Sequence, residues 1–194
     1  MEYLARFEEL DGHLFRFDTR VYLEDYRPET HSECIAAIIG KNPGSAKPSK
    51  IGSLGPLALD GDKFLPFVRN RFRNAYLSQG RNPPNNAFIR VWNLFYLCNA
   101  NLNQAKDAYR SMPDRVVCDS EKDSVPLCWF AWGPSDSQLD SYKDRFLAMR
   151  HIRPFFYDNS EKKVRESVPA ITDSVRHTQG MPAEPVKIYL SRVL

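Results

Sequence analysis

The stretch CIAAIIGKNPGSAKPSK, residues 34–50, decides the fold. Its first residues, 34–40, are small or apolar and predict a buried strand, after which the chain turns abruptly polar. Gly40 and Gly44 permit unusual backbone angles or the close approach of a ligand, and Pro43 stiffens the turn between them. Such a turn can present Asn42 and several backbone N–H groups to a crevice. The alternative is an ordinary Asx-type turn without chemistry.

The remaining sequence predicts further strands and helices in alternation. Four apolar runs are expected to be strands: residues 34–40, 87–97, 125–133 and 152–158. Helical spacing predicts helices over residues 62–77, with Asp62 as a cap, and 135–150. This pattern predicts an α/β fold of three layers, α/β/α, around a central, mainly parallel four-stranded sheet. The alternating stretch HLFRFDTRVYLEDY, residues 13–26, predicts a hairpin or edge strand.

Size and composition limit the classes of protein to consider. The chain of 194 residues is expected to form a single domain, 1–194, in which residues 1–33 are an N-terminal hairpin extension. No apolar run approaches the ~20 residues that span a membrane, and the charged N-terminal sequence does not resemble a secretory signal. We therefore expect a cytoplasmic monomer without a membrane partner. A net charge of +3 permits a nucleic-acid partner if the basic residues cluster.

The four cysteines and the glycine-rich stretch of residues 55–63 indicate no cofactor. The cysteines form no CxxC pair, so we expect buried free thiols, no metal site and no cofactor. The stretch GPLALDGDK matches neither the dinucleotide-binding nor the P-loop spacing. It is expected to be an ordinary loop that covers the site.

Two asparagines, Asn42 and Asn93, lie at or within two successive apolar runs. Asn42 follows the first run, and Asn93 lies within the second. Ligands of parallel α/β sheets bind beyond the carboxyl ends of the strands, near the switch in strand order. We therefore expect both asparagines to lie in one crevice.

Several short motifs resemble the uracil–DNA glycosylase superfamily. IIGKNPGSA (residues 38–46) is similar to the G-x-N-P-G motif of its mismatch-specific branch, and FAWGPSD (residues 130–136) resembles a strand that ends in a W-G turn. The stretches KNPGSA, VWNLF, FAWG and GMPAEPVKIYL also resemble a poorly characterised bacterial and phage family with N-P-S-T-A, V-x-N-L-F and A-W-G motifs. Together these similarities cover roughly residues 34–190.

The resemblance implies roles for particular residues. Asn42 would position the water that attacks the sugar carbon, and His177 would stabilise the departing base. The residues expected to bind the substrate are Gly40, Lys41, Pro43, Gly44, Ser45, Asn93 and Glu184. Lys47 and Lys50 would contact DNA phosphates, as nearby Arg69, Arg71, Arg73 and Arg81 could; solvated charges are the alternative.

The chain departs from the superfamily at two positions. Asn42 stands where the faster glycosylases have Asp, and an amide cannot accept a proton from water. Glu184 stands where the related family has His before Pro, so a base other than plain uracil is expected, because a carboxylate rejects the uracil carbonyls but accepts an exocyclic amine or a sugar hydroxyl. The function expected is hydrolysis of the N-glycosidic bond of an abnormal or modified base, such as a hypermodified phage base. The base would be flipped out of duplex DNA or offered on a single strand.

Two other functions fit the same residues. A non-catalytic protein of this fold could bind nucleic acid or a nucleotide, which both departures favour. An enzyme of this fold could instead process free nucleotides or nucleosides. Salt-dependent binding to duplex DNA would separate this enzyme from the other two, and alkali-labile abasic sites would identify the glycosylase.

Overall fold

The computed structural model describes residues 1–44, 50–112 and 116–194. Its strands are β1 (Tyr3–Leu10), β2 (His13–Tyr22), β3 (Glu33–Gly40), β4 (Leu54–Pro56), β5 (Ala87–Asn93), β6 (Cys128–Phe130), β7 (Pro154–Asp158) and β8 (Lys163–Arg165). Its α-helices are α1 (Phe64–Leu77), α2 (Leu102–Arg110), α3 (Asp140–Leu147) and α4 (Ala183–Val193). Two short 3₁₀ helices are η1 (Asp119–Lys122) and η2 (Ser137–Leu139). The α/β class is therefore as expected.

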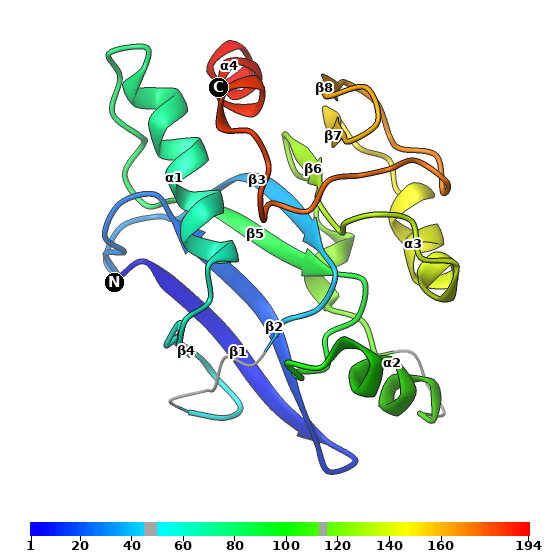
Figure 1. Ribbon diagram of the computed structural model, residues 1–194. Helices are drawn as coiled ribbons and strands as arrows, with labels where there is room; N and C mark the ends of the chain where they lie inside the picture. The colour runs from blue at the N-terminus through cyan, green and yellow to red at the C-terminus, as the bar shows by residue number, and fades with distance from the viewer. Residues whose placement is uncertain (45–49, 113–115) are drawn as a thin grey trace.

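The strands form one mixed sheet, with the order β4-β1-β2-β5-β3-β6-β7-β8 within the described ranges (Figure 1). The four strands at its centre, β5-β3-β6-β7, are mutually parallel and arise from the four predicted apolar runs. The expected four-stranded sheet is thus too small. Antiparallel strands extend both sides of the parallel centre, because β2 pairs with β5 and β8 pairs with β7. These additions satisfy backbone groups that the outer parallel strands would otherwise leave unpaired.

The N-terminal hairpin is part of this sheet. Strands β1 and β2 are antiparallel and joined at Asp11 and Gly12, whose φ angles are +51° and +72°. Two consecutive positive φ angles suit the right-handed twist of a hairpin, and Asp-Gly is a preferred pair for them. Because β2 also pairs with β5, residues of the hairpin lie beside the parallel strands.

Apolar clusters cover both faces of the sheet. Helices α1 and α4 pack over one face, where Val68 and Leu190 belong to the same buried cluster (Figure 1). Helices α2 and α3 pack over the other face, where Tyr109 and Phe146 belong to a second cluster. The predicted three layers therefore form. The connections after β3 and β5 lead to opposite faces, through α1 and α2, and this divergence opens a crevice beyond the ends of the two strands.

The C-terminal tail ends in a helix. Gly180, Pro182 and Pro185 are residue types that favour an ordered loop over a helix, yet α4 begins at Ala183. Pro185 lies in the first turn of the helix, where backbone N–H groups have no intrahelical acceptor and the missing donor costs little. The same first turn contains Glu184.

Candidate functional site

The turn after β3 is fastened to the segment that follows β5. The carbonyl of Gly40 accepts a hydrogen bond from the N–H of Leu94 at 3.1 Å. The side-chain Nδ2 of Asn42 donates to the carbonyl of Asn99 at 2.9 Å. Gly44 has a φ angle of +72°, a conformation that favours glycine. Because the carbonyl of Asn99 holds the side-chain nitrogen of Asn42, the amide of Asn42 has a fixed orientation.

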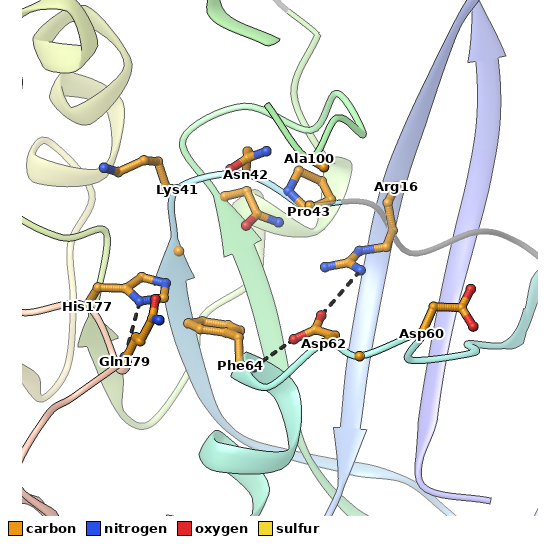
Figure 2. Close-up of a pocket in the computed structure, with 14 residues that line it drawn as sticks. Arg16, Lys41, Asn42, Pro43, Asp60, Asp62, Phe64, Ala100, His177 and Gln179 are labelled. Carbon is orange, nitrogen blue, oxygen red and sulfur yellow. Dashed lines mark hydrogen bonds and ion pairs between the residues drawn. The ribbon is translucent and has the colours of Figure 1, made fainter. Parts of the chain in front are cut away.

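A cavity of about 500 Å³ lies at the ends of β3 and β5 (Figure 2). Its walls are Arg16, Gly40, Lys41, Asn42, Pro43, Gly44, Asp60, Gly61, Asp62, Phe64, Asn93, Ala100, His177 and Gln179. Strands β3 and β5 are adjacent and parallel. The predicted placement of Asn42 and Asn93 in one crevice is therefore confirmed.

Asn93 is buried at the floor of this cavity, with 2% of its surface exposed. Its backbone carbonyl accepts a hydrogen bond from Arg145 of α3 at 2.7 Å, which holds the end of β5. Its side-chain Nδ2 is buried and has no hydrogen-bond partner among the described residues. A buried amide donor without an acceptor costs about 1–3 kcal/mol, and a bound ligand with a suitable oxygen would recover this energy.

Two rings form another wall. The rings of Phe64 and His177 are stacked, with centroids 5.4 Å apart and planes inclined by 27°. The Nδ1 atom of His177 accepts a hydrogen bond from the backbone N–H of Gln179 at 3.2 Å (Figure 2). Burial, followed by the charge of Lys41, lowers the pKa of His177 below its usual value. The imidazole is therefore neutral at pH 7, and its proton is on Nε2.

Arg16 and Asp62 lie on the side of the cavity opposite His177 (Figure 2). Arg16 comes from β2, and its side chain is 2% exposed. Asp62 precedes α1, where its Oδ1 accepts hydrogen bonds from the N–H groups of Phe64 and Leu65 at 2.7 and 3.3 Å. Asp62 is therefore the predicted cap of this helix, and it also faces the cavity.

Lys41 extends away from Arg16, towards a neighbouring hollow of about 600 Å³ (Figure 2). The two cavities share Lys41, Asn42, His177 and Gln179. Burial lowers the pKa of Lys41, while the charge of Asp136 partly opposes this effect. Arg176 also lines the hollow. Two basic side chains therefore lie beside the main cavity.

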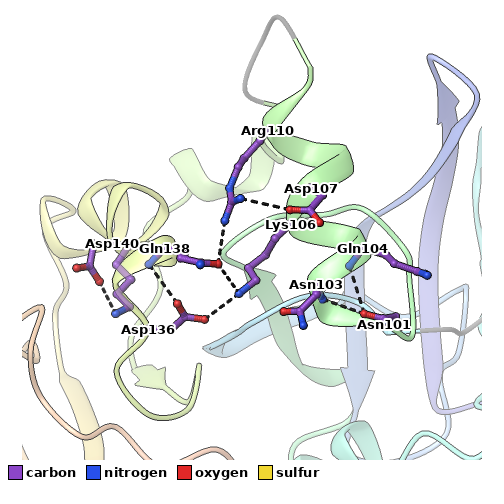
Figure 3. A network of polar contacts seen from close by, with 10 residues as sticks. Asn101, Asn103, Gln104, Lys106, Asp107, Arg110, Asp136, Gln138 and Asp140 are labelled. Carbon is purple, nitrogen blue, oxygen red and sulfur yellow. Dashed lines mark hydrogen bonds and ion pairs between the residues drawn. The ribbon is translucent and has the colours of Figure 1, made fainter.

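A polar network holds the loop after β6 near Lys41. Lys106 of α2 donates to Asp136 Oδ2 at 3.2 Å and to Gln138 Oε1 at 2.8 Å (Figure 3). Arg110, one turn further along α2, donates to the same Gln138 oxygen at 2.9 Å. Because the Lys106 side chain is only 8% exposed, its ammonium group is shielded from water, and its hydrogen bonds hold Asp136 against α2.

Other residues expected at the site lie elsewhere. Glu184 is in the first turn of α4, outside the cavity walls; its side chain is 64% exposed and pairs with Lys187 at 2.8 Å. Its expected position beside the crevice is therefore wrong, because the tail folds as a helix rather than a loop at that point. Lys50 is exposed and does not line the cavity, while Ser45 and Lys47 are outside the described residues.

The arginines expected near phosphates have protein partners instead. Arg69 pairs with Glu2 at 2.7 Å, and Arg73 pairs with Glu24 at 3.0 Å. Arg71 lies over the ring of Phe67, and Arg81 over the ring of Tyr76. These four residues do not line the main cavity.

Sequence reasoning missed several residues of the cavity wall. Phe64 lies within the predicted helix of residues 62–77 and was given no role at the site, and Asp62 was expected only as its cap. Gln179 and Arg16 gave no signal, since an arginine in an alternating strand is usually solvated. The resemblance pointed to His177, and the structure brings it into the same cavity as Asn42 and Asn93.

All four cysteines are free, as expected. Cys118 and Cys128 are also buried, whereas Cys34 and Cys98 are only partly buried. In the described ranges, no three His, Cys, Asp or Glu side chains group as metal ligands, and no helix there has the length and apolar character to cross a membrane.

No protein-family model, curated protein or solved structure matches this chain.

Proposed function

We propose that this chain is a DNA base glycosylase, which hydrolyses the N-glycosidic bond of an abnormal or modified base flipped into the main cavity. The observation that carries the proposal is the meeting of Asn42 and Asn93 in one cavity at the ends of adjacent parallel strands. The cavity volume of about 500 Å³ falls in the range of small-molecule sites and accommodates a base with a substituent.

Asn93 and Phe64 would hold the base. The unpartnered Nδ2 of Asn93 would donate to a keto oxygen or ring nitrogen of the base, and its Oδ1 would accept from a neighbouring N–H. The ring of Phe64 offers an apolar face for stacking, which flipped bases commonly use. A base that carries a donor next to an acceptor on its pairing edge would satisfy this asparagine fully.

Asn42 would position the water. Its Nδ2 is occupied by the carbonyl of Asn99, so the Oδ1 is the atom left to accept a hydrogen bond from water. An amide cannot remove the proton of that water. Bond cleavage that develops positive charge on the sugar before attack requires only an oriented water.

The departing base would take up negative charge. Asn93 Nδ2 and the Nε2–H of neutral His177 are the donors that would stabilise this anion. Preorganised donors of this kind are typically worth about 10²–10³ in rate each. Lys41 and Arg176, beside the cavity, would hold phosphates of the flipped strand.

The test is release of free bases, measured by mass spectrometry, from a panel of DNAs that includes phage genomes with modified cytosines. The wild-type chain should release one class of base and leave alkali-labile abasic sites. Asn42→Ala should lose base release while DNA affinity changes little, because an oriented water acts mainly in the transition state. Asn103→Ala, an exposed asparagine of α2, is the matched control. Absence of release across the whole panel would refute the proposal.

A second candidate is a non-catalytic nucleic-acid or nucleotide-binding protein of the same fold. The amide at position 42 favours it, since this side chain cannot act as a general base. Binding of DNA with a steep salt dependence, but without base release, would establish this function.

A further inference from the structure

Arg16 is a buried cation of the main cavity, and neither water positioning nor base stacking uses it. It lies on β2 opposite Phe7 of β1, on the face of the sheet that α1 covers. Figure 2 shows its guanidinium directed into the cavity, across from His177. The hairpin thus contributes a charge to a site whose other walls come from the ends of β3 and β5, the segment before α1 and the segment before α4.

The guanidinium has unused donors. Its Nε and Nη1 atoms are buried and have no hydrogen-bond partner in the described part of the chain. The closest carboxylate oxygen, Oδ2 of Asp62, is 4.0 Å from Nη1, which is beyond hydrogen-bond distance. Asp62 cannot approach freely, because its other oxygen accepts two N–H groups at the start of α1.

A charged group in this state favours an external partner. Guanidinium stays protonated in proteins, and burial without hydrogen bonds costs more than burial of a satisfied ion pair. Its planar fork of N–H donors matches the paired oxygens of a phosphate or a carboxylate. Among the acidic residues of the wall, Asp60 is exposed and Asp62 already accepts hydrogen bonds from α1. An oxyanion could therefore approach Arg16 from the open side of the cavity.

We propose that Arg16 forms an oxyanion subsite inside the cavity, which binds a phosphate or carboxylate group of the ligand through the N–H donors of its guanidinium. The nature of the ligand, a nucleotide, rests on the proposed function. Two parts of a nucleotide can supply the oxyanion: its own phosphate, or an acidic substituent on a modified base. Arg16 is then a specificity-determining residue, distinct from the asparagine that contacts the base.

Binding to the full chain tests the subsite without any need for catalysis. The probes are inorganic phosphate, the four deoxynucleosides and their 5′- and 3′-monophosphates, measured by calorimetry and by the shift in unfolding temperature. A second probe, 5-carboxydeoxycytidine, carries a carboxylate on the base and no phosphate. Arg16→Gln should weaken binding of the oxyanion probe that wild type prefers by roughly 10- to 100-fold, since a hydrogen bond to a charged group is lost. Binding of neutral nucleosides should not change.

Two further variants keep the result interpretable. Arg20→Gln, on the same strand but outside the cavity wall, should bind like wild type. Arg16→Lys retains the charge without the fork and should bind with intermediate affinity, which provides a test even if Arg16→Gln does not fold. A preference for monophosphates identifies the ligand's phosphate as the occupant, and a preference for 5-carboxydeoxycytidine identifies the base.

Equal affinity of wild type, Arg16→Gln and Arg16→Lys for all these anions would overturn the subsite. Loss of anion binding in Arg16→Gln would support it even if no DNA in the panel releases a base. The failure of the proposed function is therefore distinguishable from the failure of this inference.

Discussion

Replacing Gly40 by alanine should lower the rate of base release while leaving the chain folded. Gly40 ends β3, and its φ angle is outside the left-handed region, so alanine brings no backbone strain. A Cβ atom at this position would lie 3.1 Å from Oδ1 of Asn93 and 3.4 Å from Cζ of Phe64. Both neighbours are confined, because Asn93 is 2% exposed and the Phe64 ring is stacked on His177.

The size of the effect follows from these contacts. The Asn93 oxygen must move by a few tenths of an ångström to accept the methyl group. Extra atoms in a packed site typically cost about 1–3 kcal/mol, and each kcal/mol lowers the unfolding temperature of a chain of this size by ~2–4 °C. We therefore expect a decrease of roughly 2–12 °C. Since a 1 Å misplacement can cost ~100-fold in rate, a shift of this smaller size should reduce base release by about 10-fold.

The assay compares base release and unfolding temperature in two alanine variants. Gly55→Ala is the control, because a Cβ at Gly55 in β4 has no atom within 4 Å and its φ angle is also ordinary. It should retain wild-type activity and stability. Wild-type release by a folded Gly40→Ala chain would refute the reasoning, because the positions of Asn93 and Phe64 would then not matter for the reaction.

Three other predictions concern stability, proton binding and the tail. Lys106→Met should destabilise the chain by about 1–3 kcal/mol in denaturant unfolding, whereas Lys122→Met, whose lysine is 79% exposed, should change it little. Burial and the charge of Lys41 lower the pKa of His177 below 6.5, so below that pH the unfolded state binds more protons and stability falls. His177→Gln should therefore reduce the fall in unfolding temperature between pH 7 and pH 5. A fall as large as that of the wild type would contradict this. Glu184→Gln should leave the profile of released bases unchanged, and an altered profile would place this exposed carboxylate near the ligand after all.

The sequence predicted those parts of the site that depend on parallel strands. Buried parallel strands are nearly continuous apolar runs, so β3 and β5 could be located, and the residues that end them could be placed together. Asn42 and Asn93 were found in this way. The apolar run of residues 87–97 was too long for the strand, because residues beyond Asn93 are buried without continuing it.

Arg16 could not be found from the sequence, for a physical reason. In the alternating stretch of residues 13–26 a polar residue is expected to face water. The hairpin instead pairs with β5, and α1 covers the face on which Arg16 lies. Tertiary packing therefore decided the environment of this side chain. The helix α4 was missed for a related reason: Pro185 reads as a helix breaker, although the first turn tolerates it.

The hairpin that carries Arg16 is separate in the chain from the groups proposed to act on the glycosidic bond, and this separation could be used in design. The groups proposed to act on the glycosidic bond come from the ends of β3 and β5 and from the segment between β8 and α4, whereas Arg16 comes from a local, antiparallel unit closed by Asp11 and Gly12. Because β2 pairs with β5 and β1 pairs with β4, a replacement hairpin would have to keep the residues that make these pairings. Grafting hairpins with other residues at position 16 would vary ligand selectivity while the reacting groups stay in place.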